Sequence, residues 1–395
     1  MIDGVDDRSP TFNSFNYKNV DLRSDMKTMP TKKMRESVLT GIYGDMDNLT
    51  DPTVEMLENY VKNFLGKEYG LMVGSGTMAN LIISLLDVGP KKEEYVLAGD
   101  ISHSLTYEKP MLYVGGVNYI PLPTLTSGVF DFKNEVELEQ ILVDFHKNNK
   151  VNLPFEDFLS KIKLLLVENT HNYFGGKILP VEYPTQLRNI CLNLGKKYPQ
   201  FKVKMGLDGS RVLHAAIEQQ VDPKVLCKEY DILHISCTKI VGGPLGNIIC
   251  MNSYDDFLRV KYLRKGAGGG MRQAGISASM ILTGFENLYE KLRYDHKNSR
   301  LLEEGLDKIK DVRAEKNRTN LVRIFLEGKL KGKEDLLVKL LEDKYKVLMY
   351  KFDLTKDVYI RAAFHYQVST KQTEYTIFAW EQVINEINNS SNAKF

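Results

Sequence analysis

Short apolar runs rich in branched residues recur along the first two thirds of the chain. From about Phe64 onward they alternate with segments whose apolar residues recur every three or four positions, a pattern typical of strands joined by crossover helices. This order predicts an α/β fold with a mostly parallel, seven-stranded sheet and right-handed crossovers. The expected strands are Tyr69–Val73, Glu94–Ala98, Val117–Pro121, Lys163–Glu168, Val203–Asp208, Ile232–Ser236 and Asn247–Met251, and the helices between them include Met78–Leu86, Glu135–His146 and Thr185–Lys197.

After Met271 the pattern changes to that of a small α+β domain. A single hydrophobic core rarely grows beyond ~250–300 residues, so we predict an N-terminal arm over residues 1–30, a large α/β domain over 31–270 and a small domain over 271–395. The small domain is expected to contain a long helical stretch at Ala274–Ile309, strands at Asn320–Leu326 and Val358–Phe364, and helices at Glu334–Lys344 and Lys371–Ile387.

Charge and composition exclude several classes of protein. The 53 Lys and Arg residues against 51 Asp and Glu residues leave a net charge of +2, which gives no reason to expect a nucleic acid or membrane partner. No window approaches the ~18 apolar residues of a spanning helix. The acidic start, Met1–Pro10, resembles neither a signal nor a transit peptide, so we expect a cytoplasmic protein. The four cysteines form no C-x-x-C pair, which favours buried, reduced thiols over a zinc site, and we expect no metal.

A glycine turn, Gly74-Ser75-Gly76-Thr77, lies between a predicted strand and a predicted helix. Free N–H groups at a helix N-terminus bind phosphate, and a Ser or Thr hydroxyl adds a donor. Read with Ala79, the run also matches the loose dinucleotide pattern G-x-G-x-x-A, with Glu93 and Glu94 at about the required spacing. A tight turn without a ligand remains an equal alternative at this point.

Asp208-Gly209-Ser210-Arg211 follows one predicted strand, and Lys239 follows the next. The carboxyl ends of parallel strands meet at one edge of the sheet, where ligands bind. A lysine amine in a dry site forms a Schiff base, and a carboxylate can hold a pyridine nitrogen protonated, so the pair indicates a carbonyl cofactor. Each residue taken alone has an ordinary reading as a cap or a surface charge.

Two of the seven histidines, His103 and His171, fall on the same predicted edge, where imidazole can stack on a cofactor ring or move a proton. For His146, His234 and His296 we infer only an ordinary hydrogen-bonded position. The glycine-rich run Gly266–Gly270, flanked by Arg264, Lys265 and Arg272, indicates both an interdomain hinge and an anion site.

Taken together, these motifs resemble those of the L-threonine aldolases, pyridoxal phosphate (PLP) enzymes of fold type I within the β-eliminating lyase group. The resemblance extends from Asp21 to at least Thr370. It is carried by the motifs Asp21-Leu22-Arg23-Ser24-Asp25, Asp51-Pro52-Thr53-Val54, Gly74 through Asn80, His103 with Tyr107-Glu108, Glu168 through Asn172, Asp208 through Arg211, Lys239, and Gly268 through Gln273.

The resemblance assigns roles residue by residue. Lys239 is implied as the lysine that bonds the cofactor, Asp208 as the partner of the pyridine nitrogen, His103 as the ring-stacking residue and His171 as the group facing the substrate's β-hydroxyl. The remaining implied contacts are Ser75, Gly76 and Thr77 at the phosphate, Arg211 and Thr238 at the cofactor, Lys265 and Arg272 reaching across a subunit boundary, and Ser24, Arg211 and Arg361 at the substrate carboxylate.

The implied reaction is retro-aldol cleavage of a β-hydroxy-α-amino acid, such as L-threonine or L-allo-threonine, to glycine and an aldehyde. In this reaction His171, directly or through water, takes the β-hydroxyl proton. The implied partners are a small amino acid substrate and further copies of the chain, in a dimer or tetramer with the active site at the subunit interface.

Several residues depart from the family pattern. Ile240 follows the lysine where the family has Gly, Thr238 precedes it in place of Ser, and the family's active-site Tyr aligns to Asn48, with Tyr43 five positions earlier. The stretch Phe145–Lys161 reads as an insertion. Alternatives therefore include β-elimination, transamination, and aldol cleavage of a bulkier substrate such as phenylserine or 3-hydroxyaspartate. A catalytically lapsed scaffold and a nicotinamide dehydrogenase are further alternatives.

Overall fold

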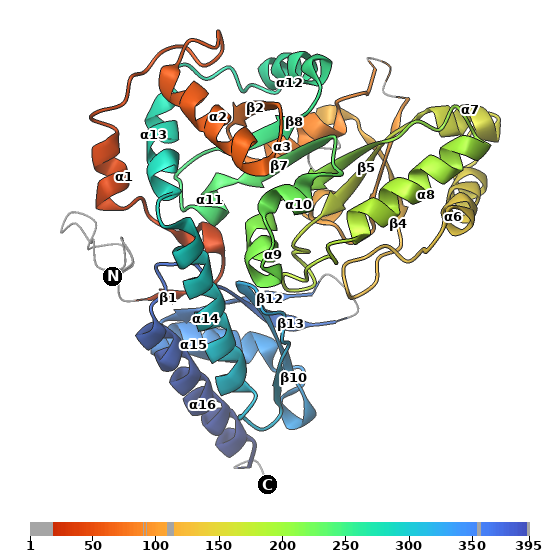
Figure 1. Ribbon diagram of the computed structural model, residues 1–395. Coiled ribbons are helices and arrows are strands. Elements are labelled where there is room, and N and C mark those ends of the chain that lie inside the picture. The colour runs from red at the N-terminus through yellow and green to blue at the C-terminus, as the bar shows by residue number, and fades with distance from the viewer. Residues whose placement is uncertain (1–18, 90, 92, 109–113, 354–356, 393–395) are drawn as a thin grey trace. The chain divides into compact units, whose positions relative to one another are not determined.

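The computed structural model describes residues 19–89, 91, 93–108, 114–353 and 357–392 (Figure 1). Two compact units are present. We refer to Thr40–Cys237 with Leu245–Ile281 as the sheet unit, and to Met1–Leu39 with Thr238–Pro244 and Leu282–Phe395 as the terminal unit. In the described part of the chain, no helix is both long and apolar enough to cross a membrane. The division into arm, large domain and small domain that we derived from the sequence stays a prediction.

The sheet unit is built on seven strands, as predicted. Strand β8 runs antiparallel to both neighbours and the remaining neighbours pair in parallel, so the predicted α/β class with a mostly parallel sheet is confirmed. The order across the sheet is β2 (Tyr69–Val73), β8 (Asn247–Met251), β7 (Ile232–Ser236), β6 (Lys204–Asp208), β5 (Ile162–Glu168), β3 (Tyr95–Gly99) and β4 (Asn118–Leu122).

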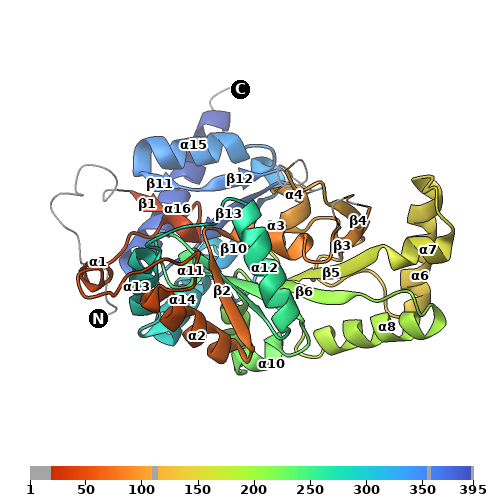
Figure 2. The same cartoon turned by 90° about the horizontal axis from the view of Figure 1, so that it is seen from above.

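Helices cover both faces of this sheet, with α3 and α12 on one face and α8 and α10 on the other (Figure 2). Strands buried on both faces must be apolar along their length, and β7 and β8 are buried at every position. The helices assigned wholly to the sheet unit for which the structure gives both ends are α2 (Pro52–Leu65), α3 (Gly76–Ser84), α4 (His103–Thr106), α6 (Glu135–Asn148), α7 (Phe155–Ser160), α8 (Tyr183–Lys197), α9 (Val212–Gln219), α10 (Pro223–Cys227) and α12 (Tyr254–Gly266).

Local chemistry explains why α3 begins where it does. The Ser75 hydroxyl accepts a hydrogen bond from the backbone N–H of Met78 at 3.1 Å, which is the usual arrangement at a helix N-cap. The helix therefore starts at Gly76, two residues before the predicted start. Its apolar face, Ala79, Ile82 and Ile83, packs into the core formed with the strands.

The terminal unit contains an antiparallel sheet ordered β12 (Tyr350–Phe352), β13 (Tyr359–Ala363), β10 (Leu321–Leu326) and β9 (Val312–Ala314). A parallel pair, β1 (Val20–Asp21) with β11 (Val347–Leu348), completes its strands in the described residues. Its core includes Trp380, which is fully buried. The remaining helices assigned wholly to this unit are η2 (Asp25–Lys27), α1 (Lys32–Ser37), α14 (Leu288–Leu306), η3 (Gly328–Leu330), α15 (Glu334–Tyr345) and α16 (Thr370–Asn392).

Two predicted segments differ in detail from the structure. The helical stretch expected over Ala274–Ile309 is two helices, α13 (Gly275–Gly284) and α14, because Asn287 adopts a left-handed conformation with φ of 53° that an α-helix does not accommodate. The stretch interpreted as an insertion contains α7, whose Phe158 ring lies 6.1 Å from the Phe145 ring of α6. Aromatic packing therefore gives this segment its own fixed structure.

Glu303 on α14 offers a pH-dependent test of the terminal unit. Its side chain is buried, and burial raises the pKa of the carboxyl from an ordinary 4.5 to about 7. The proton bound to the Glu303 carboxyl therefore stabilises the fold fully below about pH 4.5, and this stabilisation is lost as the pH rises through 7. We expect the free energy of unfolding of the wild type, relative to Glu303→Gln, to fall by on the order of 3 kcal/mol between pH 4 and pH 8.

Urea unfolding at a series of pH values measures this difference. The neutral Gln variant is the reference at every pH, so titration of other groups cancels in the comparison. A difference between the two proteins that stays constant across the series contradicts the assignment.

Candidate active site

Three acidic side chains gather at the carboxyl edge of the seven-stranded sheet. Asp208 ends β6 and Glu168 ends β5, and the two residues are paired in the register of the sheet. Glu108 follows α4, which the chain reaches after leaving β3. This edge is the one at which α/β proteins bind ligands.

The carboxylate of Asp208 is held from three directions. It is 4% exposed. One oxygen, Oδ1, accepts the backbone N–H of Ser210 at 3.1 Å and lies 3.2 Å from His234 Nε2, while Oδ2 accepts from Asn80 Nδ2 at 2.9 Å. Because a buried carboxylate is stable only when its oxygens are hydrogen-bonded, these partners fix both its charge and its orientation.

Asn80 on α3 links Asp208 to Glu108. Its amide nitrogen donates to Glu108 Oε2 at 2.9 Å, and the Thr77 hydroxyl donates to Glu108 Oε1 at 2.8 Å. The ring nitrogen Nδ1 of His103 lies 3.5 Å from the same Oε1. Burial alone would raise the pKa of the Glu108 carboxyl, but its bonds to His103 and Asn80 outweigh burial and lower that pKa below the ordinary value.

Glu168 fixes the two loops that carry the predicted histidines. One carboxylate oxygen accepts the backbone N–H of His103 at 2.9 Å, and the other accepts the backbone N–H of Asn172 at 2.8 Å. His171 precedes Asn172, is buried, and its ring centroid lies 4.6 Å from that of Phe174. A single strand-end acid therefore holds the backbone of both histidine loops.

Arg211, predicted to bind cofactor and substrate, is buried at the start of α9. Its Nη1 donates to Asn172 Oδ1 at 3.3 Å, so the guanidinium is directed toward the His171 loop. Sequence reasoning had linked these residues only through their shared edge. The structure adds a side-chain contact between the two segments.

The predicted phosphate loop forms the first turn of α3. The Thr77 hydroxyl is already bonded to Glu108, so the donors that remain for an anion at this turn are backbone N–H groups and the hydroxyl hydrogen of Ser75. Gly76 lies close to the strand behind it, because a Cβ at this position would come within 3.1 Å of the Asn247 amide. A side chain at residue 76 would therefore require the Asn247 side chain to shift by a few tenths of an ångström.

Lys265 and Arg272 both bind acidic residues of the loop that precedes α2. Lys265 Nζ lies 2.5 Å from Asp47, and Arg272 Nη1 lies 3.2 Å from both Asp45 and Asp47. Their ion pairs hold the pKa of the Asp47 carboxyl below its usual value. Asn48, at the position of the family tyrosine, donates to Asp45 at 2.9 Å. The reach of both cations toward a neighbouring subunit stays a prediction.

Four predicted site residues belong to the terminal unit. Lys239 and Thr238 lie on the short helix α11 (Cys237–Ile240), directly after β7. Ser24 caps η2, where its hydroxyl accepts the N–H of Met26 at 3.3 Å. Arg361 is buried on β13, donates to the backbone oxygen of Arg23 at 3.4 Å and lies over the Phe352 ring. Their roles at the cofactor and substrate stay predictions.

Sequence reasoning missed His234 and Asn80. His234 is hydrogen-bonded, as inferred, but it is fully buried on β7 rather than in a loop, and its ring lies next to Asp208. No periodic pattern separates a buried strand histidine from a core residue. A signal was present for Asn80, since an amide on the apolar face of the α3 pattern needs a buried polar partner.

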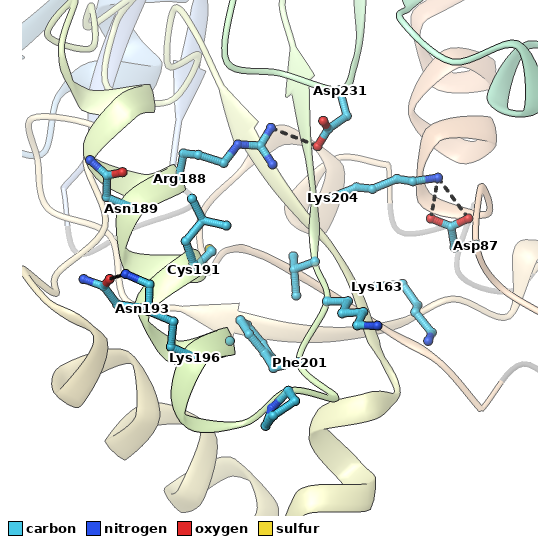
Figure 3. A pocket seen from close by; sticks show the side chains of 15 residues that line it. Asp87, Lys163, Arg188, Asn189, Cys191, Asn193, Lys196, Phe201, Lys204 and Asp231 are labelled. Carbon is cyan, nitrogen blue, oxygen red and sulfur yellow. Dashed lines mark hydrogen bonds and ion pairs between the residues drawn. The ribbon is translucent and has the colours of Figure 1, made fainter.

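A depression of about 1100 Å³ lies at the amino ends of β5 and β6 (Figure 3). Two of its lining cations form ion pairs, with Lys204 3.0 Å from Asp87 and Arg188 2.9 Å from Asp231. Burial raises the pKa of the lining thiol, Cys191, to about 12, which leaves it protonated and unreactive. All four cysteines are buried and free, as predicted.

Comparisons with known proteins agree with the fold. The low-specificity L-threonine aldolase 1 of Arabidopsis thaliana is 31% identical over 370 residues, which cover 93% of this chain and 97% of that protein. The structure of a threonine aldolase from Leishmania major superposes with a TM-score of 0.73 at 17% identity, covering 92% of this chain and 99% of the other.

A serine palmitoyltransferase from S. paucimobilis with bound PLP–myriocin aldimine has the same fold, with a TM-score of 0.68 at 16% identity, covering 94% and 88% of the two chains. The model of the family described as beta-eliminating lyase matches residues 21–329. This span contains the glycine turn, both histidine loops, Asp208 and Lys239. The chain is therefore a member of the beta-eliminating lyase family.

Proposed function

We propose that the protein is a PLP-dependent aldolase that cleaves L-threonine or L-allo-threonine to glycine and an aldehyde. The observation that carries this proposal is the clamped carboxylate of Asp208 beside the N-terminus of α3. The comparisons support the proposal through a relative that is 31% identical over 93% of this chain and is named a low-specificity L-threonine aldolase.

The residues at the carboxyl edge fit PLP, which carries a pyridine nitrogen at one end and a phosphate at the other. Asp208 is an ionised, immobile acceptor of the kind that a protonated pyridine nitrogen requires. The first turn of α3 supplies N–H donors and a positive dipole end for a phosphate. The imidazole of His103, whose side chain is 21% exposed, supplies a flat ring held in place by Glu108.

When bound, PLP supplies an electron sink, because its protonated ring accepts the electron pair released when the Cα–Cβ bond of the substrate breaks. Asp208 maintains that sink by holding the proton on the ring nitrogen. Glu168 keeps His103 and His171 at their loop positions through backbone bonds. Lys239 would hold the cofactor through its side-chain amine.

The remaining residues act on the substrate. Arg211, with Ser24 and Arg361, binds the carboxylate and orients the bond that is to break, and such positioning is worth ~7–11 kcal/mol in favourable cases. His171 removes the β-hydroxyl proton, directly or through water, so that the aldehyde can leave. A proton returned to Cα then gives glycine. The second candidate is β-elimination, which the description of the matched family favours.

Substrate cleavage tests the proposal most directly. We expect purified protein, loaded with PLP and incubated with L-threonine, L-allo-threonine or L-phenylserine, to release glycine and aldehyde in equal amounts. Glycine is quantified by amino acid analysis and the aldehyde by a coupled dehydrogenase. Release of ammonia and a keto acid instead of glycine identifies β-elimination, and absence of every product supports the lapsed scaffold.

Lys239→Ala tests the cofactor assignment. We expect this variant to lose the near-visible absorbance of lysine-bound PLP and to lower cleavage by at least about a thousandfold, because it removes the covalent attachment. Lys197→Ala is the matched control, since Lys197 is an exposed lysine on α8 that pairs with Glu139 of α6. A Lys239→Ala spectrum identical to that of the wild type rules out the assignment.

Arg272→Gln tests the predicted contact across the subunit boundary. We expect the Kd for PLP to rise about tenfold with the oligomeric state unchanged, because a charge-assisted bond to phosphate is worth roughly 1.5–3 kcal/mol. Arg313→Gln is the control, because Arg313 is also half-exposed and paired with a carboxylate, Glu327. Equal PLP affinity in both variants, measured by equilibrium dialysis, places Arg272 outside the phosphate site.

A further inference from the structure

His234 lies beside Asp208 on the neighbouring strand of the sheet. It occupies the position on β7 that pairs with Asp208 on β6, and its side chain is fully buried. Its Nε2 has two neighbours, Asp208 Oδ1 at 3.2 Å and Asn80 Oδ1 at 3.0 Å. The hydrogen positions on the ring follow from what these neighbours can accept or donate.

The orientation of the Asn80 amide is fixed independently of His234. Its nitrogen faces two carboxylates, Glu108 Oε2 and Asp208 Oδ2, each at 2.9 Å, and only an amide nitrogen can donate to both. Asn80 therefore presents its carbonyl oxygen to His234. Both neighbours of Nε2 are acceptors, so this ring nitrogen carries a hydrogen.

The other ring nitrogen, Nδ1, faces the Asn247 amide at 3.2 Å. With the amide oxygen toward Nδ1, that oxygen also accepts the backbone N–H of Gly76 at 3.3 Å, and the amide nitrogen donates to Gly246 O at 2.8 Å. The reverse orientation would set two oxygens 2.8 Å apart and two donors 3.3 Å apart. The partners thus select an oxygen opposite Nδ1, so Nδ1 also carries a hydrogen.

We propose that His234 is a buried imidazolium, protonated on both ring nitrogens, and that it is a positioning residue which ties Asp208 to the first turn of α3. Nε2–H holds Asp208 as a carboxylate in place. Nδ1–H holds the Asn247 oxygen that also binds the N–H of Gly76. The role at the cofactor rests on the proposed function, whereas the protonation state does not.

Two features support this arrangement. A buried cation is stable when it is paired and fully hydrogen-bonded, and Asp208 is the carboxylate that pairs with this ring. The chain of contacts from Asp208 through His234 and Asn247 to Gly76 also joins the residue proposed for the pyridine nitrogen to the turn proposed for the phosphate. The spacing of the two ends of the cofactor site is thereby set by one side-chain network.

The protonation state is measured on the protein without PLP, by two-bond ¹H–¹⁵N correlation on deuterated, ¹⁵N-histidine-labelled protein at pH 7. The chain has seven histidines. The His234 signal is assigned by its loss in His234→Gln or, should that variant not fold, by elimination with Gln variants of the other six. We expect both His234 nitrogens at protonated-type shifts. One unprotonated-type nitrogen overturns the proposed imidazolium.

The positioning role is tested by the Kd for PLP and by the spectrum of the loaded protein. His234→Gln keeps a donor for Asp208 and removes the charge, and we expect it to weaken PLP binding at least about tenfold and to shift the absorbance of bound PLP. His146→Gln is the matched control, because His146 lies on α6 and its ring contacts Leu153 O, away from this network. Unchanged affinity and spectrum in His234→Gln overturn the positioning role.

The two measurements also separate this proposal from the proposed function. A doubly protonated His234 in a protein that cleaves no β-hydroxy amino acid leaves the imidazolium established and overturns the aldolase. A neutral His234 in an active aldolase overturns only the imidazolium.

Discussion

Burial of the Asp208 carboxylate is the constraint that organises the carboxyl edge of the sheet. A buried charge costs several kcal/mol unless it is fully hydrogen-bonded, and Asp208 obtains its bonds from its own loop, from α3 and from β7. Each of these elements must therefore lie where its donor reaches the same carboxylate. The position of α3 at the sheet edge, and hence of the glycine turn at its start, follows from the bond between Asn80 and Asp208.

Three carboxylates at one edge would repel one another if they were bare, and the structure separates them with shared donors. The Asn80 amide gives one hydrogen to Asp208 and one to Glu108, so it cross-links the two acids. Burial and the Asp208 charge raise the pKa of the Glu108 carboxyl, but the bonds of Glu108 to His103 and Asn80 outweigh both. Glu168 takes backbone hydrogens from two different loops. Glu168 therefore both carries a charge at the site and holds the backbone at His103 and Asn172 in place.

The sequence predicts the sheet well because β7 and β8 are short, mostly apolar runs, which begin after Asp231 and Gly246, and a strand buried on both faces has that pattern. It also places Asp208 and Glu168 at strand ends. It does not reveal His234, because a strand buried on both faces shows no alternation that marks one face as functional. The contact of His234 with Asp208 depends on the register between β6 and β7, which is set by packing of the whole sheet.

The break at Asn287 was likewise hidden, since the apolar spacing continues through it while the backbone does not. Local patterns predict which residues are buried, but they do not predict a single left-handed residue. The division of the chain into two units likewise depends on contacts between parts of the chain that are distant in sequence. The segment Thr238–Pro244 leaves the sheet unit between two of its strands and is grouped with the chain termini.

Covalent geometry nevertheless restricts where Lys239 can lie. It follows the last residue of β7, Ser236, by three positions, and three residues span at most about 11 Å even when fully extended. This limit holds for any arrangement of the two units, because it depends only on the chain. The predicted cofactor lysine is therefore tethered to the same strand whose His234 contacts Asp208, so one strand, β7, contributes both the support of the acid and the attachment of the lysine.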